Sequence, residues 1–348
     1  MKLGDRLECT PEQWGFGGEG LERRPDGSWL IVAHAIPGER VLAEIVREPK
    51  RPGGAWRARV VEVLEPSKDR TDPRCPHYSR CPGCQLRHVD YALEKELKRR
   101  AVRDALSKFG GFDTDEAHSL VEEVRGAPRR DGYRVRGNPG AVTADGRPAM
   151  HPFPGSGPPV PMDECPVMDQ DALHDEASGW TLPNPDMRKA LVQTVRSLLA
   201  LSGSEQVLEI GAGQGGLTVE CAGGARRWVG LDVDPAALEV GRQAVDRAGL
   251  AGTVELRAGR LEKVARRLFV RCGAFDVALL NPMRRPLGRA AMAALSGLGV
   301  RRCVYVGPSP VSAARDLASL NLPLRRVIPV DLYPGTYHVL VVALVEAL

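Results

Sequence analysis

The chain has no apolar run approaching the length of a membrane-spanning helix, and its first residues carry no apolar signal-peptide core. It also has no internal repeat and no strong excess of charge, because its formal net charge is only +4 over 348 residues. A charge of this size is weak support for a polyanionic partner. We therefore expect a cytoplasmic, monomeric globular protein of two or three domains that does not bind membranes.

Eight cysteines occur in a chain expected to be cytoplasmic, where thiols stay reduced or bind metal. Cys75, Cys81 and Cys84 are separated by five and two residues and are flanked by proline and glycine. Cys165 is a candidate fourth ligand. Soft thiolates select zinc or an iron–sulfur cluster, and the spacing alone does not distinguish zinc from [4Fe-4S] or exclude unligated thiols. The others are expected to be small apolar packing residues: Cys9, Cys221, Cys272 and Cys303.

The stretch Val207–Thr218 predicts a cofactor-binding loop. An apolar run containing Glu209 leads into alternating glycines at Gly211, Gly213 and Gly215, and a helical pattern follows. This order is typical of a strand, a tight turn and a helix. Glycine permits the sharp turn and lets the backbone approach a ligand with no side chain between them.

A second apolar run, residues 228–232, ends in Asp232. Two neighbouring parallel strands would present this carboxylate beside the glycine loop, where it can accept hydrogen bonds from two ribose hydroxyls. The loop also satisfies the pattern G-x-G-x-x-G, so a nicotinamide dinucleotide is an alternative ligand. Glu209 favours S-adenosylmethionine, because an acid two residues before the first glycine can face the cationic methionine amine.

The chain divides into three parts by pattern. Short strands punctuated by glycine and proline predict a small β-barrel over residues 1–66. Residues 67–185 hold the cysteines and a poorly patterned central segment. Residues 186–348 begin with a helix over 186–201 and then alternate strands and helices, which predicts an α/β class with a doubly wound sheet. The connection 332–337 is too short for a helix, so the final strand must be antiparallel to its partner.

A helix is predicted from a cap at Asp90 to a stop at Gly110. Its apolar positions form one stripe, and its basic side chains lie mostly on the other side. The stripe consists of Leu93, Leu97, Val102, Leu106 and Phe109, and the basic strip of Lys95, Lys98, Arg99 and Arg103. We expect this basic strip to contact RNA phosphates, although solvated surface charge is the alternative.

Several short motifs occur along the chain in one order. They are Gly17–Gly20, Ile36–Glu39, Pro66–Arg70, Cys75–Tyr91, Leu208–Gly215, Tyr305–Asp316 and Pro334–Val339. In this order they resemble the bacterial RNA (uracil-C5)-methyltransferases that modify ribosomal and transfer RNA. The resemblance implies a TRAM-type RNA-binding barrel, a [4Fe-4S] segment with Cys165 as fourth ligand, and an adenosylmethionine domain. It is also what favours a cluster over zinc.

The chain departs from this family at the positions that carry its chemistry. The resemblance places the family's nucleophilic cysteine at Pro308, its glutamate base at Leu340, and the aspartate of its Asp-Pro-x-Arg motif at Asn281. The resemblance also leads one to expect an aromatic residue, an asparagine and a glutamine. This chain has Gly211, Gly216 and Leu182 at those three positions, in that order. We still expect Asn281 to contact the cofactor. Asp232 is retained.

These departures lead to three hypotheses of function. The first is a family member that binds structured ribosomal or transfer RNA and adenosylmethionine but has lost uracil-C5 methylation. Cys303 does not restore the nucleophile, because it lies five residues before Pro308 and so near the other end of an extended strand. The second is an active RNA methyltransferase with a different target, because 281–283 resembles the start of an amine-methylation motif. The third is an iron–sulfur redox sensor.

Overall fold

The computed structural model describes residues 1–51, 53–136, 140–152, 157–169, 171, 182–282 and 286–347. The chain forms two compact units. The first comprises residues 1–97, 129–174 and 333–337, and the second comprises 98–128, 175–332 and 338–348. No helix in the described ranges is both long and apolar enough to cross a membrane.

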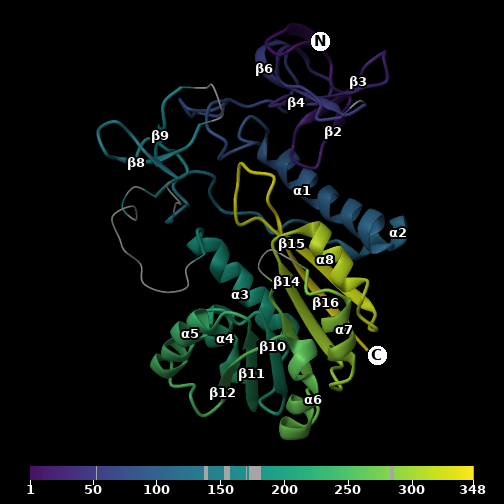
Figure 1. Ribbon diagram of the computed structural model, residues 1–348, viewed down its shortest axis with the longest axis vertical. Helices are drawn as coiled ribbons and strands as arrows, with labels where there is room; N and C mark the ends of the chain where they lie inside the picture. Colours follow the sequence, from purple (N-terminus) through teal and green to yellow (C-terminus); the bar gives the residue numbers. More distant parts are fainter. Residues whose placement is uncertain are drawn as a thin grey trace. The chain divides into compact units, whose positions relative to one another are not determined.

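The N-terminal part of the first unit is a six-stranded sheet (Figure 1). Its strands are β1 (Arg6–Cys9), β2 (Gln13–Trp14), β3 (Gly20–Arg23), β4 (Trp29–Ala33), β5 (Arg40–Arg47) and β6 (Ala55–Glu65), in the order β1-β5-β6-β4-β3-β2. Alternating residues such as Leu30, Val32 and Ile45 point into a core of its own, which also contains Cys9. The predicted small β module and the packing role of Cys9 are confirmed.

An ion pair explains why two of the N-terminal motifs occur together. The Glu39 side chain is fully buried and accepts hydrogen bonds from the Arg70 guanidinium, at 2.6 Å for Nη2 to Oε2. The same carboxylate accepts from the backbone N–H groups of Ile36 and Ser67. Arg70 also donates to the carbonyl of His34. The motif Pro66–Arg70 therefore stabilises the turn Ile36–Glu39 through these hydrogen bonds.

Residues 333–337 belong to the first unit although they lie far along the chain. The backbone N–H of Gly335 donates to the buried Glu94 carboxylate at 2.7 Å, and its carbonyl accepts from Leu86 at 2.8 Å. The Tyr133 hydroxyl donates to the carbonyl of Pro334. Glu94 also pairs with Arg130 at 2.8 Å. A small sheet in the same unit has the order β7-β8-β9, with bounds Ala141–Val142, Pro148–Met150 and Val160–Pro161.

The second unit contains a seven-stranded sheet in the order β12-β11-β10-β13-β14-β16-β15. Its strands are β10 (Gln206–Ile210), β11 (Arg227–Asp232), β12 (Val254–Ala258), β13 (Val277–Leu280), β14 (Arg302–Gly307), β15 (Leu324–Val330) and β16 (Leu340–Glu346). The strands from β12 to β14 pair in parallel, whereas β16 is antiparallel to both β14 and β15. The predicted antiparallel final strand is confirmed, and it is inserted beside β14.

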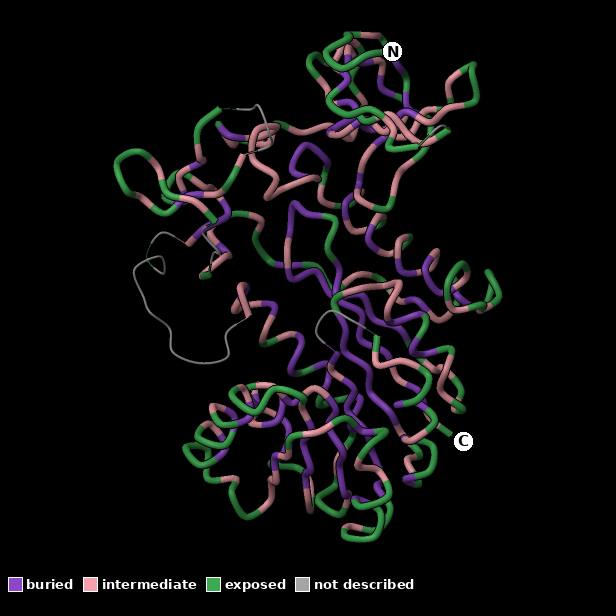
Figure 2. The backbone as a smooth tube through the Cα atoms, viewed as in Figure 1, coloured by how far each residue is buried: buried purple, intermediate pink, exposed green. Residues whose placement is uncertain are grey.

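Helices cover both faces of this sheet (Figure 1). They are α3 (Pro185–Leu199), α4 (Gly216–Cys221), α5 (Pro235–Arg247), α6 (Leu261–Cys272), α7 (Arg289–Ser296) and α8 (Pro310–Leu317). One core cluster joins buried residues of β10, β11, β13, β14 and β16 to α6, α7 and α8. Figure 2 shows the buried strands between exposed helical surfaces. Leu208 and Ile210 of β10 lie in this cluster, so Glu209 between them faces the opposite side, which α4 and α5 cover.

The helix α1 (Tyr91–Ala105) continues as a π-helical turn, Leu106–Gly110, and ends at Gly111 with φ = 72°. Another short helix, α2 (Thr114–Leu120), follows it. The predicted helix and its cap are confirmed, because the Asp90 carboxylate accepts from the N–H of Ala92. The predicted burial of Phe109 is wrong, since its side chain is exposed. The i→i+5 pattern of the π turn shifts the phase of the residues that follow it.

The prediction that Lys98 lies on an exposed basic strip is also wrong. Its side chain is 1% exposed and its ammonium group lies 2.7 Å from the carboxylate of Asp331, which is fully buried. Taking two charges out of water is costly unless they remain paired. Lys98 therefore acts within the second unit, where it compensates the charge of Asp331, and it is not available to a phosphate.

We predict that Lys98→Met will strongly destabilise the protein, because it leaves the Asp331 carboxylate buried without its cation. The expected loss is about 3–5 kcal/mol in the free energy of unfolding, measured by urea denaturation. The control is Lys108→Ala, which removes an exposed lysine paired with Asp104 at 2.9 Å and should cost less than about 1 kcal/mol. Equal effects of the two variants would contradict the buried pair.

Candidate functional site

The predicted glycine loop joins β10 to α4. Gly211, Gly213 and Gly215 all have positive φ angles, of 88°, 52° and 78°. Side chains are disfavoured in this left-handed region. At Gly211 there is a second constraint, because an added Cβ would lie 2.3 Å from the carbonyl oxygen of Asn281. Glycine is therefore required at this position by both the backbone angle and the neighbouring strand.

Asp232 ends β11, next to the loop. Its Oδ2 accepts a hydrogen bond from the backbone N–H of Gly213 at 2.8 Å, and its Oδ1 accepts from Asp234 at 2.9 Å. The side chain is half-buried, so the carboxylate is both held in place and accessible. The sequence predicted this arrangement of a loop and an acid at the ends of two parallel strands, and the structure has it. Contact of Asp232 with a ribose stays a prediction.

Asn281 follows β13 at the same edge of the sheet. Its backbone N–H donates to the carbonyl of Ile210 at 2.8 Å, and its side-chain amide donates to the carbonyl of Gly211 at 3.2 Å. These bonds place it against the first turn of the loop, and its contact with a cofactor stays a prediction. Met283 of the predicted 281–283 motif lies outside the described residues.

Glu209 adopts a position that the sequence did not predict. The side chain is fully buried, and its Oε2 accepts hydrogen bonds from the Thr218 hydroxyl and, at 2.9 Å, from the Trp228 indole. Its Oε1 has no hydrogen-bond partner among the described residues. Burial raises the pKa of Glu209 to about 7, against the effect of the two hydrogen bonds. Its contact with a methionine amine stays a prediction.

The four predicted cysteine ligands line one cavity in the first unit: Cys75, Cys81, Cys84 and Cys165. None is in a disulfide. Burial, with a smaller contribution from the nearby Cys165, raises the pKa of Cys84 to about 12. No group of three or more His, Cys, Asp or Glu in the described part of the chain is placed to hold a metal ion. The structure thus brings the four thiols to the lining of one cavity.

Two positively charged side chains contribute to the lining of this cavity, a feature that the sequence analysis missed. Arg87 and Arg134 line it. The buried Arg87 guanidinium is held by Asp131 at 2.6 Å and by the carbonyls of Pro73 and Arg130. Such cations favour the thiolate form of cysteine. The donor set and the charge of its surroundings therefore fit an anionic metal–thiolate group.

The remaining residues of the predicted basic strip are half-buried on α1. Lys95 lies over the Tyr91 ring at 5.5 Å, and the Arg99 guanidinium donates to the carbonyl of Val121 at 3.1 Å. Lys95, Arg99 and Arg103 are four residues apart, so they lie on one face of the helix. RNA contact by these three residues stays a prediction.

Comparison with known proteins gives matches over a domain and over the whole chain. Residues 207–295 match a family model described as a methyltransferase domain. An uncharacterized RNA methyltransferase of Streptomyces coelicolor is 26% identical, with 99% of this chain and 93% of that protein covered. A 23S rRNA (uracil(1939)-C(5))-methyltransferase of Chromohalobacter salexigens is 25% identical, with 94% and 86% covered.

A solved structure shares the fold across both units. It is the tRNA (uracil-54, C5)-methyltransferase of Pyrococcus abyssi in complex with S-adenosyl-L-homocysteine, with a TM-score of 0.73 and 18% identity over 97% of this chain and 99% of that one. The resemblance to RNA (uracil-C5)-methyltransferases is confirmed. The alignment with the S. coelicolor protein extends over 432 residues, against 348 in this chain. That relative of the family therefore has segments without a counterpart here.

Pro308 and Leu340, where the family resemblance places its nucleophile and its base, are adjacent in this fold. Gly307, the last residue of β14, pairs with Val341 of β16. Pro308 and Leu340 are the next residues beyond that pair on the two antiparallel strands. That these two positions correspond to a nucleophile and a base of the family stays a prediction. Neither side chain can donate an electron pair or accept a proton.

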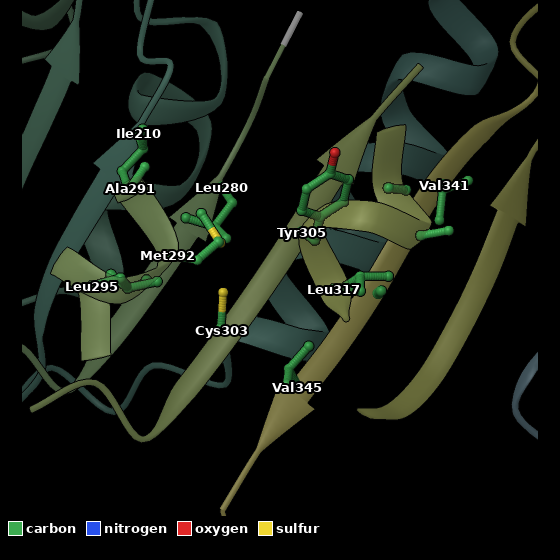
Figure 3. Close-up of a cluster of buried hydrophobic side chains, with 14 of the residues drawn as sticks. Ile210, Leu280, Ala291, Met292, Leu295, Cys303, Tyr305, Leu317, Val341 and Val345 are labelled. Carbon is green, nitrogen blue, oxygen red and sulfur yellow. The ribbon is translucent and has the colours of Figure 1, made fainter. Parts of the chain in front are cut away.

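Cys303 is the second residue of β14, the strand that ends just before Pro308, and Figure 3 shows its side chain among buried hydrophobic side chains. It is fully buried among apolar side chains, and burial raises the pKa of its thiol far above the usual range. It pairs with Ala278 and Val345 on the neighbouring strands. The prediction that Cys303 is a packing residue is confirmed, and it lies near the opposite end of the strand from Pro308.

Asp316 has a structural role that the sequence did not reveal. Its carboxylate is almost fully buried and accepts hydrogen bonds from the N–H groups of Leu287 and Gly288, at 2.9 and 3.0 Å, and from the Tyr305 hydroxyl at 3.2 Å. It thereby fixes the segment that leads into α7. This motif residue of the family serves the backbone in the present chain.

We predict that Gly211→Ala will destabilise the second unit and remove adenosylmethionine binding. The left-handed angle alone costs an L-residue about 1–2 kcal/mol, and the new Cβ must also displace the Asn281 carbonyl. Thermal unfolding and calorimetry with adenosylmethionine measure both effects. The control is Gly223→Ala, where no atom lies within 4 Å of an added Cβ. An unchanged Gly211→Ala protein would refute the required close approach.

Proposed function

We propose that this protein binds structured RNA and S-adenosylmethionine, carries a [4Fe-4S] cluster, and lacks cysteine-dependent uracil methylation. The observation that carries the proposal is the contrast between two parts of one sheet edge. The glycine loop and Asp232 keep the arrangement of a cofactor site. The adjacent pair of family catalytic positions holds Pro308 and Leu340. A protein with this combination can hold the methyl donor and RNA without activating a uracil.

Support for adenosylmethionine comes from the loop. Its positive-φ glycines leave the backbone uncovered, and Asp232 offers a carboxylate for the ribose hydroxyls. The methyltransferase family model covers this region. When bound, adenosylmethionine supplies an electrophilic methyl group. The residues proposed to hold it are Glu209, Gly211, Gly213, Gly215, Asp232 and Asn281.

Support for the cluster comes from the cysteine cavity. Four thiols surround it, and Arg87 and Arg134 supply positive charge. The cysteines of a cubane bind four different irons, so they stand farther apart than the ligands of a single ion. Zinc would instead need all four sulfurs at about 2.3 Å from one point. The cluster would be an anionic group within the first unit.

We predict that protein purified without oxygen will be brown and contain about four irons per chain. Cys81→Ser should lower the iron content and the visible absorbance, because it removes one thiolate ligand. Cys272→Ser, which changes a half-buried cysteine of α6, is the matched control and should retain the iron. Stoichiometric zinc without iron would rule out the cluster. A spectral response to oxidants without RNA binding would favour a redox sensor.

Support for RNA comes from the basic face of α1 and from the relatives. The names of the matched proteins specify ribosomal RNA or transfer RNA as their substrates. The six-stranded N-terminal sheet is proposed to be a TRAM-type RNA-binding barrel, and the protein is proposed to act as a monomer. Phosphates would be neutralised by Lys95, Arg99 and Arg103, whereas Lys98 is excluded by its burial.

We predict that replacing Lys95, Arg99 and Arg103 together by alanine will weaken binding to structured ribosomal or transfer RNA. Loss of three phosphate contacts should reduce the slope of log affinity against log salt by about 2–3, measured by filter binding. The control replaces Lys263, Arg266 and Arg267, three exposed positive residues of α6. If the α1 and α6 variants bind alike at every salt concentration, the proposed phosphate contacts do not exist.

We predict that the purified protein makes no 5-methyluridine in RNA from a strain that lacks this modification. Uracil C5 attacks a methyl sulfonium only after a thiolate has added to C6, and a base must then remove the C5 proton. Mass spectrometry of nucleosides after incubation with adenosylmethionine measures the product. Appearance of 5-methyluridine would show that other side chains replace Pro308 and Leu340. Appearance of a methylated exocyclic amine would instead support the second hypothesis, in which Asn281 serves a different target.

A further inference from the structure

Glu209 is a buried acid without a cation beside it in the described part of the chain. Its side chain is 0% exposed. Both of its hydrogen-bond donors are neutral, the Thr218 hydroxyl and the Trp228 indole, and both reach the same oxygen, Oε2. The other oxygen, Oε1, has no partner among the described residues. An isolated carboxylate in such surroundings is costly, and it lowers the cost by taking up a proton.

The charged groups on neighbouring elements do not offset a negative charge at Glu209. On β11 the charged group that acts on Glu209 is Asp232, whose negative charge raises the pKa of Glu209. From α4 it is the thiol of Cys221, whose pKa burial raises to about 12 with a further increase from Glu209. The arginines of α3, Arg188 and Arg196, bind Glu220. The buried residues of α5 are Leu238, Gly241 and Val245.

Glu209 also connects the three elements that build the cofactor loop. It lies on β10, which leads into the loop. Thr218 lies on α4, which begins where the loop ends, and Trp228 lies on β11, which ends in Asp232. Adenosylmethionine carries positive charge on its sulfonium and its amine. A cation brought to this loop favours the ionised form of a nearby acid.

We propose that Glu209 loses a proton to solvent when adenosylmethionine binds near neutral pH, so that the carboxylate then balances the charge of the cofactor. This inference rests on the proposed cofactor function. One O–H bond of the carboxyl group breaks and its proton passes to the buffer, with no other change in bonding. Glu209 is thus a positioning residue whose ionisation makes cofactor affinity depend on pH. The sign follows from its pKa of about 7 in the free protein: affinity rises with pH until the free protein is ionised.

The test is calorimetry of the full-length protein with adenosylmethionine in phosphate and in Tris buffer, which differ in heat of ionisation. The difference in observed heat gives the number of protons released. We expect about half a proton per cofactor at pH 7 and about 0.9 at pH 6, with affinity about fivefold tighter at pH 7 than at pH 6. In this range the amine of the cofactor stays protonated.

Variants assign the proton to Glu209. Glu209→Gln keeps an oxygen acceptor for Thr218 and Trp228 but should release no proton and show a flat pH profile. Trp228→Phe removes a hydrogen bond that favours the carboxylate, so the proton released at pH 7 should increase. Glu239→Gln, an exposed acid on α5 that pairs with Arg242 at 2.9 Å, is the matched control and should behave as the parent.

The outcomes separate this inference from the function on which it rests. Binding with equal heats in the two buffers would overturn the proton release and leave the cofactor function standing. Release that persists in Glu209→Gln would assign the proton to another group and also overturn it. Absence of any binding by the parent at millimolar cofactor would overturn both. The buffer comparison on the parent protein decides the matter even if a variant fails to fold.

Discussion

The geometry of the cofactor loop depends on a close approach between two backbones. The carbonyl of Asn281 occupies the space that a side chain at Gly211 would need, and Asn281 donates hydrogen bonds across this contact to the carbonyls of Ile210 and Gly211. The aromatic residue that the family resemblance leads one to expect at Gly211 therefore has no room here. Because the loop is fixed by backbone contacts, it keeps its form although several family side chains around it have been replaced. The proposed loss of the catalytic pair is therefore compatible with retention of the loop.

Local patterns predicted most of the fold, and long-range partners account for what they did not predict. The short connection before β16 was enough to predict its antiparallel direction, and the glycine spacing predicted the loop beside Asp232. Burial of Lys98 depends on Asp331, 233 residues away in sequence, and helical periodicity holds no information about that partner. The predicted burial of Phe109 was wrong for a local reason, because the π-helical turn shifts the phase of the residues that follow it. The inward position of Glu209 requires donors on two other elements, Thr218 and Trp228.

The two proposed ligand sites have opposite electrostatic character. Arginines line the cysteine cavity, where thiolates would carry negative charge. Two acids lie at the glycine loop, where burial and the charge of Asp232 raise the pKa of Glu209 and a cationic ligand would favour its ionised form. Neither site has balanced charges on its own. The cysteine cavity is complementary to an anionic metal–thiolate group, and the glycine loop is complementary to a cationic ligand. This complementarity does not require the uracil chemistry of the relatives.

Because of the hydrogen bonds of residues 333–337, the first unit can finish folding only late in protein synthesis. Domains generally fold as units while the chain leaves the ribosome. The first unit cannot finish in this way, because Glu94 receives the N–H of Gly335, a residue made 241 positions later. At typical translation rates this delay is roughly 10–50 s. Throughout that interval the carboxylate of Glu94 and the N–H of Leu86 lack those backbone partners. A nascent first unit would therefore remain accessible to chaperones until residues 333–337 are made.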